Sequence, residues 1–251
     1  MDWINSLSLF LGSLIANTLA SLSGGGAGLL QFPLLLFLGL PFGQALATHK
    51  VASVALGLGA AYTHFKNRSI PVSFGFYVIA IGSLGVILGA NLILKIPDHI
   101  AEFSLGIMII ALGLYSYVKK DLGINETIQR RQPIGFILGG FVLFFIGIIN
   151  GSLTAGSGLL VTLFLVQWFG YSYKQAVALT LVCVGLFWNG IGGIAVSMAG
   201  APIYWEWLPI LLFSSFLGGA LGAKLALVSS NQIIKKAFEL LTFAVGIKLL
   251  F

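Results

Sequence analysis

The stretch SGGGAGLLQFPLLLFLGL, Ser23–Leu40, joins a glycine cluster to an apolar run, and the pattern returns in LTAGSGLLVTLFLVQWFG, Leu153–Gly170. Both apolar runs are short, since a helix that crosses the hydrocarbon core of a bilayer needs about 20 apolar residues. Pro33 also interrupts the first run. The pair of stretches therefore indicates two short helices that begin inside an apolar environment, one in each half of the chain.

The composition of the whole chain explains what that environment is. Of the 251 residues, 58% are hydrophobic and 8% are charged, and the mean hydropathy is +1.04. A soluble domain carries about 25% charged residues, so this chain could not cover a surface that faces water. Lipid, by contrast, solvates apolar side chains and disfavours charge. We therefore expect an all-α polytopic membrane protein whose partner is the lipid bilayer.

Charge and cysteine content exclude several other classes. The net charge of +6 could suggest a nucleic-acid partner, but the basic residues lie mostly in short gaps between apolar runs, where they set membrane orientation instead. Cys183 is the single cysteine, so intramolecular disulfides and a cysteine metal cluster are not expected. No GxxxxGK[ST] loop is present, so the chain itself is not expected to use ATP, and no cofactor is predicted.

Ten apolar segments follow one another along the chain. They run approximately over residues 5–22, 26–40, 45–65, 71–94, 99–118, 134–152, 156–170, 174–199, 203–227 and 231–251. The first has no basic residue before it, so we interpret it as a retained span rather than a signal peptide. The polar stretch 119–133 separates two halves of five segments each. The expected organisation is an N-terminal repeat, 1–118, a cytoplasmic linker, 119–133, and a C-terminal repeat, 134–251.

The two halves match each other in order. Ser23–Leu30 matches Leu153–Leu160 at an offset of 130, Gln44–Ala47 matches Gln175–Ala178 at 131, and Gly89–Leu92 matches Gly222–Leu225 at 133. Because five segments is an odd number, two such repeats would have opposite orientations in the membrane. Inverted repeats with interrupted helices at matching positions are typical of secondary transporters.

The basic residues test this orientation. If all ten segments cross, one face collects ten of them, and the other face collects Lys95 and Lys248. The ten are Lys66, Arg68, Lys119, Lys120, Arg130, Arg131, Lys174, Lys224, Lys235 and Lys236. Basic residues favour the cytoplasmic side, so both termini are expected outside a multi-pass protein of the inner membrane. If the two short segments only dip into the membrane, this bias largely disappears.

The glycine clusters are candidate parts of a binding site. A helix that starts within the membrane leaves its first N–H groups unpaired, and these groups and the helix dipole attract an anion. Glycine lets the backbone approach a ligand closely. We therefore expect an anion between the two helix starts. The candidate glycines are Gly24, Gly25, Gly26, Gly28, Gly156 and Gly158. The alternative is tight helix packing by small residues.

The motif THKVAS, Thr48–Ser53, lies early in the third segment and supplies the candidates Thr48, His49, Lys50 and Ser53. A lysine inside a span is costly and favours an anionic substrate. The alternative is that Lys50 reaches the nearby interface. His49 could titrate near neutral pH or could simply be a packed polar residue. His64 and His99 are assigned to the interface.

Other polar residues inside spans complete the candidate substrate site. They are Asn150, Thr154, Ser157, Thr180 and Asn189, and Thr180 matches His49 at an offset of 131. Asparagine can donate hydrogen bonds to an oxyanion or can join neighbouring helices. Glu239, the carboxylate placed well inside a span, follows Lys235 by one helical turn and is expected to pair with it.

These residues together carry a family resemblance. GGGAGLLQFPLLL (Gly24–Leu36), with Gln31, ALATHKVAS (Ala45–Ser53), the polar linker and the second GSGLL block resemble the TauE/SafE family of sulfite exporters, from about residue 8 to the end. The resemblance implies export of sulfite or organosulfonate anions. The second half lacks an equivalent of Pro33 and has Leu181 where the first has Lys50, so the half-sites differ chemically.

The leading hypothesis is a secondary transporter of small sulfur-containing oxyanions that works by alternating access and is not an enzyme. An anion channel is an alternative. An intramembrane serine protease is a further one, since Ser157 lies in AGSG, although rhomboid proteases carry GxSG and this chain has Ala155 at the first position. A homodimer is possible.

Overall fold

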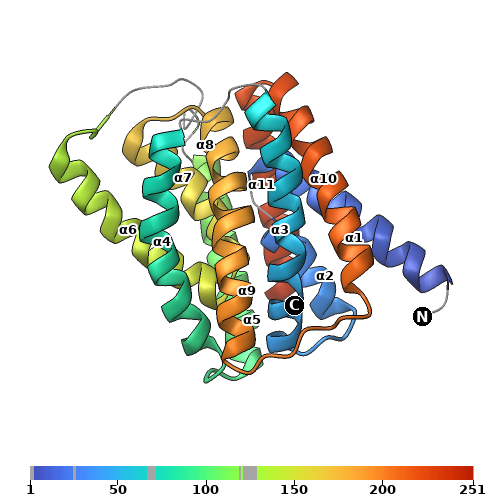
Figure 1. Ribbon diagram of the computed structural model, residues 1–251. Helices are drawn as coiled ribbons and strands as arrows, with labels where there is room; N and C mark the ends of the chain where they lie inside the picture. The colour runs from blue at the N-terminus through green and yellow to red at the C-terminus, as the bar shows by residue number, and fades with distance from the viewer. Residues whose placement is uncertain (1–2, 25–26, 67–71, 119, 121–128, 251) are drawn as a thin grey trace.

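A computed structural model describes residues 3–24, 27–66, 72–118, 120 and 129–250 (Figure 1). Every regular element in these ranges is helical, which confirms the expected all-α fold. The first half contains α1 (Trp3–Ser23), the 3-10 helix η1 (Ala27–Leu29), α2 (Gln31–Phe37), α3 (Phe42–Lys66), α4 (Val72–Ile93) and α5 (Asp98–Val118). The second half contains α6 (Pro133–Ser152), α7 (Ser157–Phe169), α8 (Tyr173–Thr180), the π-helix η2 (Leu181–Trp188), α9 (Asn189–Met198), α10 (Leu208–Val228) and α11 (Asn231–Leu250).

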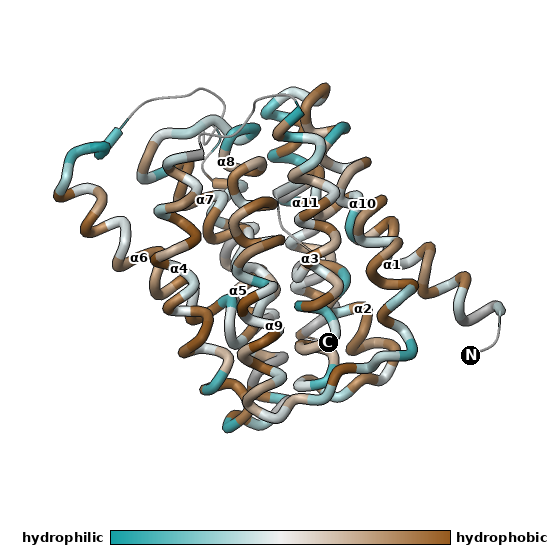
Figure 2. The backbone as a smooth tube through the Cα atoms, in the orientation of Figure 1, coloured by the Kyte–Doolittle hydropathy of each residue, from teal (hydrophilic) through white to brown (hydrophobic). Residues whose placement is uncertain are grey.

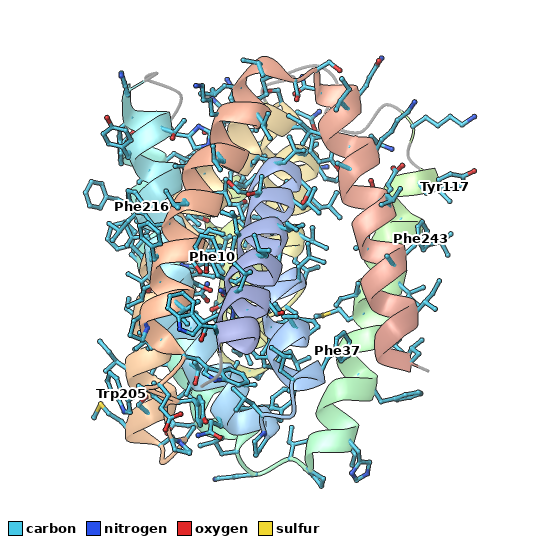
Figure 3. All side chains as sticks on the ribbon, turned by 90° about the vertical axis from the view of Figure 1, so that its right-hand side faces the viewer. Phe10, Phe37, Tyr117, Trp205, Phe216 and Phe243 are labelled. Carbon is cyan, nitrogen blue, oxygen red and sulfur yellow. The ribbon has the colours of Figure 1, made fainter. Side chains whose placement is uncertain are left out.

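Length and composition would allow five of the described helical stretches to cross a bilayer. These are Ser6–Ser23, Ser73–Ile93, Pro133–Ser152, Tyr173–Met198 and Leu208–Val228. Large apolar side chains cover the outside of the bundle, and hydrophilic residues gather mainly at its two ends (Figure 2). Aromatic side chains such as Phe216 and Trp205 lie at its periphery (Figure 3). This pattern suits a surface that faces lipid.

The expected segments correspond to helices in order, but two boundaries differ. The segment predicted over 26–40 is divided into η1 and α2, and α2 ends at Phe37. The segment predicted from 203 begins as α10 only at Leu208, because Pro209 favours the first turn of a helix. Residues before it form a loop in which Trp205 is 68% exposed.

The expected single span over 174–199 contains a π-helix at its centre. This region, η2, joins α8 to α9, and Trp188 ends it with its ring buried against α4. The indole Nε1 donates to the carbonyl of Val78 at 3.2 Å. A side chain at Gly82 would overlap that ring. Interruptions of this kind occur frequently at functional sites, and hydropathy alone did not indicate it.

Close helix pairs explain many of the glycines. Helix α4 lies parallel to α6, and a side chain at Gly85 or Gly89 would collide with the α6 backbone. Helix α1 lies parallel to α10, where Gly218 and Gly222 meet the α1 backbone in the same way. Small residues allow such close approach of helices in membranes. Glycine at these four positions therefore serves close helix packing.

The arrangement of the pairs relates one half of the chain to the other. The first apolar segment of each half packs on the fourth segment of the other half: α1 packs on α10, and α6 packs on α4. The last segments, α5 and α11, pack on each other. Helix α3 lies at the centre against α9, η2 and α10 (Figure 1). An inverted repeat would give this exchange of partners, although the repeat itself stays a prediction.

The two ends of the bundle differ in the chain segments that they hold. At one end, the backbone N–H of Lys174 donates to Asn231, and the N–H of Gln129 donates to Phe169. At the other end, Gly43 lies against Leu94 and Ala201. Lys174 therefore shares an end with the residues that border the linker, as it would if all ten segments cross. Which end faces the cytoplasm stays a prediction, and most of the linker lies outside the described residues.

Candidate functional site

The two glycine-rich turns meet inside the bundle. In the first half, α1 ends at Ser23 and the chain resumes with η1 at Ala27; Gly25 and Gly26 lie outside the described residues. A Cβ atom built on Gly28 would lie 3.0 Å from the carbonyl oxygen of Thr154 and 3.1 Å from the backbone nitrogen of Ala155. The turn that precedes α2 and the turn that precedes α7 are therefore in direct backbone contact.

The two helix starts at this meeting point are not equivalent. Helix α7 has 13 residues and begins after Gly156, whose φ of +80° favours glycine. Helix α2 has only 7 residues and follows the 3-10 turn η1. Since the dipole sums over aligned peptide units, α7 contributes the stronger positive end. Gly158 lies in the first turn of α7.

Thr154 has an unusual backbone conformation. Its φ is +56°, and it shares this left-handed region with Arg130 among the described non-glycine residues. Such a conformation costs on the order of 1–3 kcal/mol and tends to occur at functional sites. It places the Thr154 hydroxyl beside the tip of Lys50, at 3.2 Å.

Lys50 is completely buried, so the interpretation that it reaches the interface is wrong. Its Nζ donates to the carbonyl oxygen of Asn150 at 2.8 Å, to Asn150 Oδ1 at 3.3 Å and to Thr154 Oγ1 at 3.2 Å. None of these acceptors carries a charge. The salt bridge found among the described residues does not include Lys50; it joins Lys235 and Glu239. Lys50 is thus a buried amino group without a carboxylate partner among the described residues.

Asn150 connects Lys50 to the other polar residues of the second half. Its Nδ2 donates to Ser157 Oγ at 2.9 Å and to Asn189 Oδ1 at 3.3 Å. Ser157 in turn donates to the carbonyl oxygen of Thr154 at 2.5 Å. We call these five residues, Lys50, Asn150, Thr154, Ser157 and Asn189, the lysine cluster. All five were predicted from the sequence as candidate site residues, and the structure places them together.

A second polar group surrounds His49 and consists of neutral residues. The ring contacts Gln31 Oε1 through Nδ1 at 3.0 Å and Ser53 Oγ through Nε2 at 3.1 Å. Gln31 Nε2 donates to the hydroxyls of Ser13 and Ser215, both at 2.8 Å. We call His49, Gln31, Ser53, Ser13 and Ser215 the histidine cluster. Ser13 and Ser215 were not among the sequence candidates, because isolated serines in spans carry no distinctive pattern.

Thr180 and Thr48 lie outside both clusters. Thr180 Oγ1 is 2.9 Å from Thr162 Oγ1, which is 3.1 Å from the carbonyl oxygen of Gly24. Thr162 and Thr180 are 18 residues apart, the same separation as Gln31 and His49. The Thr48 hydroxyl accepts a hydrogen bond from the backbone N–H of Tyr204 at 2.9 Å and so ties α3 to the loop before α10.

Three further expectations concern other side chains. His64 lies in the last turn of α3, is 1% exposed, and neither ring nitrogen has a hydrogen-bond partner; its place at the membrane interface stays a prediction. The ion pair between Lys235 and Glu239 is confirmed, at 2.6 Å. The hydrogen bonds of Ser157 go to Asn150 and Thr154, and those of His49 go to Gln31 and Ser53. The Ser157–His49 pair that a serine protease would need is therefore not formed.

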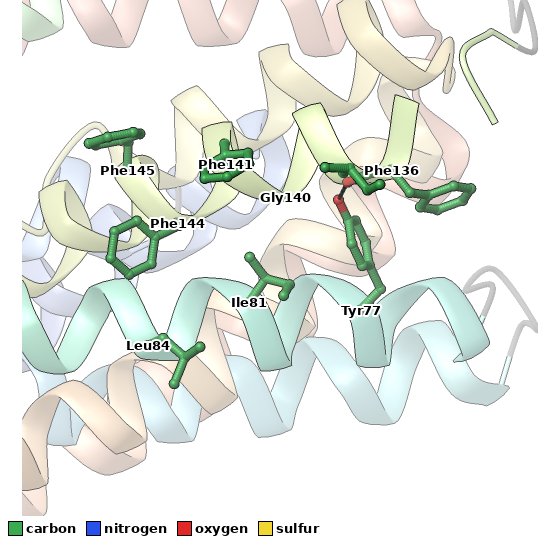
Figure 4. Close-up of a pocket in the computed structure, with 9 residues that line it drawn as sticks. Tyr77, Ile81, Leu84, Phe136, Gly140, Phe141, Phe144 and Phe145 are labelled. Carbon is green, nitrogen blue, oxygen red and sulfur yellow. Dashed lines mark hydrogen bonds between the residues drawn. The ribbon is translucent and has the colours of Figure 1, made fainter. Parts of the chain in front are cut away.

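An apolar groove on the outside of the bundle is separate from these clusters. It lies between α4 and α6, has a volume of about 560 Å³ and is lined by residues that include Tyr77, Leu84, Phe136 and Phe141 (Figure 4). Few polar atoms line the groove, and the Tyr77 hydroxyl already donates a hydrogen bond to the carbonyl of Phe136. A groove of this kind suits lipid chains rather than an anion.

Known proteins resemble this chain over nearly its whole length. The model of the family described as "Sulfite exporter TauE/SafE" matches residues 9–249. A "Probable membrane transporter protein" of Haemophilus influenzae is 27% identical over 244 residues, which cover 97% of this chain and 93% of that protein. The "Probable membrane transporter protein YfcA" of Escherichia coli K12 is 27% identical over 246 residues, with 97% and 88% covered.

A "Probable membrane transporter protein YdhB" of Bacillus subtilis is 25% identical over 244 residues, which cover 95% of this chain and 97% of that protein. No solved structure matches the chain. The family match, the apolar helices and the names of these relatives agree with one another. The chain belongs to the TauE/SafE sulfite exporter family and is a membrane transporter.

Proposed function

We propose that this transporter exports a small sulfur-containing oxyanion, sulfite or an organosulfonate, and binds it beside Lys50 where the two glycine-rich turns meet. One observation carries the proposal: the Lys50 ammonium is buried without a carboxylate partner. Removing a charge from water is expensive unless another charge offsets it. A bound anion would supply that opposite charge.

The surroundings of Lys50 suit an oxyanion. Asn150 carries an amide with two N–H donors, and the hydroxyls of Thr154 and Ser157 can each donate once. In the structure these groups bond to one another. The oxygens of a bound anion could replace the present acceptors of these hydrogen bonds. Hydrogen bonds from charged donors to charged acceptors are about twice as strong as neutral ones. The N-terminal turn of α7, which begins at Ser157, adds the positive end of its helix dipole on the same side.

The burial of the site supports alternating access. Lys50 is fully buried, and Asn150, Thr154 and Ser157 are at most 3% exposed. An anion could therefore reach this site only after helices move apart. In the proposed inverted repeat, rocking of one half against the other would open the site to one side of the membrane and then to the other. A permanently open channel would leave these residues exposed to water.

The expected orientation in the membrane rests on the basic residues. Lys174 shares an end of the bundle with the residues that border the linker, and basic residues favour the cytoplasmic side. We therefore expect the linker to face the cytoplasm, both termini to face outward and the protein to lie in the inner membrane.

Counterflow in proteoliposomes tests the function. Purified protein is reconstituted, and exchange of labelled substrate is measured with sulfite, sulfate, thiosulfate, sulfoacetate and lactate. We expect saturable exchange of one or more sulfur oxyanions, weak exchange of lactate and a strong loss in Lys50→Ala. Absence of exchange with every sulfur anion would refute the substrate class. Flux that never saturates would indicate a channel.

A further inference from the structure

His49 occupies a buried position immediately next to Lys50 on α3. Its exposed fraction is 0%, and each ring nitrogen has its own partner. Nδ1 lies 3.0 Å from Gln31 Oε1, and Nε2 lies 3.1 Å from Ser53 Oγ. The distance from Nδ1 to Ser53 Oγ is longer, at 3.4 Å. The histidine is thus held in a defined orientation by two oxygen atoms.

The hydrogen bonds of Gln31 decide which ring nitrogen carries the proton. The Gln31 amide nitrogen donates to Ser13 and to Ser215, each at 2.8 Å. Its Oε1 therefore faces the imidazole, and a carbonyl oxygen can only accept. Nδ1 must then be the donor, so neutral His49 carries its hydrogen there. Nε2 keeps its lone pair and accepts from the Ser53 hydroxyl.

The same surroundings can hold the protonated ring. A second proton adds to the lone pair of Nε2, and the Ser53 hydroxyl rotates so that its oxygen accepts from the new N–H. The bond from Nδ1 to Gln31 is unchanged. Both nitrogens of the imidazolium then donate to oxygen atoms already in place. His49 can therefore gain or lose a proton without leaving an unpaired buried nitrogen.

Few other titratable groups face this position. The described elements that pack on α3 are η1, α1, α2, α8, η2, α9 and α10. Of these, η1, α2 and α9 contain no titratable side chain, and α10 contains only Lys224, which is exposed. The η2 thiol of Cys183 donates to the carbonyl of Gly75. In α8, Tyr173 bonds to Ser116 and Lys174 donates to the carbonyl of Leu227. Helix α1, which reaches His49 through Ser13 and Gln31, contains none within its described range. Lys50, on α3 itself, is the remaining charged neighbour.

The partly buried carboxylate of Glu239 already has partners. Glu239 pairs with Lys235 at 2.6 Å and accepts from Ser116 at 3.0 Å, between α5 and α11. That pair belongs to the outer helices rather than to the meeting point of the turns. A proton carrier close to the anion must therefore come from α3.

We propose that His49 is the proton-coupling residue of this transporter and that a proton and the anion cross the membrane together, in the same direction. The inference rests on the proposed anion site at Lys50. Protonation of Nε2 adds a second positive charge on the residue next to Lys50 in α3, and this charge attracts the bound anion. The anion then raises the affinity of the site for a proton, and the proton raises its affinity for the anion by the same factor.

The test uses proteoliposomes with the membrane potential clamped by potassium and valinomycin. Sulfate and thiosulfate are the probes, because these anions carry no proton of their own near neutral pH. For one proton per anion, a gradient of one pH unit supports up to about tenfold accumulation of the probe. We expect this accumulation in the wild-type protein, together with counterflow at equal pH.

The decisive variant is His49→Asn. The asparagine amide nitrogen replaces Nδ1 as the donor to Gln31 but cannot titrate. We expect counterflow to continue at saturating anion but with a higher half-saturation concentration, because exchange needs no net proton movement while the neighbouring charge is lost. Accumulation driven by the pH gradient should disappear. His64→Asn is the matched control, since His64 is also buried on α3 but belongs to neither cluster. That variant should accumulate the probe like the wild-type protein.

A second readout guards against a variant that folds poorly. When thiosulfate is added to the detergent-solubilised wild-type protein in a weakly buffered indicator solution, the protein should take up protons. Ser53→Ala keeps the ring and its bond to Gln31 but removes the partner of Nε2, so this uptake and the accumulation should both fall severalfold.

The outcomes separate the two proposals. Undiminished accumulation in His49→Asn, or wild-type counterflow without any accumulation, would overturn the role of His49 and leave the anion site intact. Absence of wild-type counterflow with every sulfur anion would overturn the anion site and the coupling together.

Discussion

Replacing Lys50 with methionine tests the anion site most directly. The change removes the charge and keeps much of the volume of the side chain. The wild-type ammonium makes three contacts, to the carbonyl and Oδ1 of Asn150 and to Thr154. A hydrogen bond that involves a charged group contributes about 1.5–3 kcal/mol. Loss of one such bond to the anion should weaken binding by about 10- to 100-fold.

Stability without anion should change much less. The variant leaves the acceptors of Asn150 and Thr154 unpaired, which is unfavourable by about 1–3 kcal/mol. It also removes a buried charge, and replacing buried ionic groups by apolar ones is often neutral or stabilising. These two effects oppose each other. The expected signature is therefore a loss of anion affinity with little loss of folding.

Thermal unfolding in detergent measures both quantities. At an anion concentration of about 100 times Kd, the wild-type protein should gain about 2.7 kcal/mol, and a 100-fold weaker variant should gain only about 0.4 kcal/mol. Lys95→Met is the control, since Lys95 is exposed at one end of the bundle. Equal anion-dependent stabilisation in Lys50→Met and the wild-type protein would refute the site.

Lys50→Arg gives an intermediate expectation. The charge is retained, so binding should be stronger than in Lys50→Met. A Cβ atom at Gly192 would lie 3.0 Å from Lys50 Nζ and 3.0 Å from a methyl group of Val86. This lack of space disfavours the larger guanidinium, and affinity should remain below that of the wild-type protein.

Further predictions concern the turns, the outer helices and the orientation. Gly28→Val should abolish counterflow in protein that still inserts, because its side chain would press on the turn before α7; Gly190→Ala, which has room, should transport normally, and normal transport by both would contradict the close contact. Glu239→Gln should lower the melting temperature without changing anion affinity, since its ion pair with Lys235 lies within α11 and is bonded to Ser116 of α5. A loss of affinity would show that this pair acts on the site. Lys120→Cys should react with an impermeant maleimide only from the cytoplasmic side of the membrane, while the buried native Cys183 stays unlabelled; labelling from outside intact cells would reverse the proposed orientation.

The sequence predicted the lysine cluster because its members are conspicuous. A lysine, two asparagines and small hydroxyl residues within apolar spans must find partners, and the glycine turns marked where the chain would reverse. The repeat then suggested that these partners come from opposite halves. Lys50 from α3 indeed meets Asn150 at the end of α6 and Thr154 in the turn that follows.

Other parts of the site could not be predicted in this way. Ser13 and Ser215 bond to Gln31 from helices that are distant in sequence, and serine is common in membrane helices. His64 is buried because of how the end of α3 packs. Its position in the sequence, beside a basic stretch, did not predict this burial. The π-helix η2 leaves hydropathy unchanged, because its residues are all apolar or small.

The asymmetry of the two halves explains why one anion site is expected rather than two. In the proposed repeat, Thr180 stands at the position of His49, and Leu181 stands at that of Lys50. Thr180 accepts from the hydroxyl of Thr162, which also donates to the carbonyl of Gly24, so the second half has no cation at the matching sequence position. The second half instead contributes Asn150, which holds Lys50 across the junction. A site assembled from both halves changes shape whenever one half moves against the other, and this dependence is what alternating access requires of a binding site.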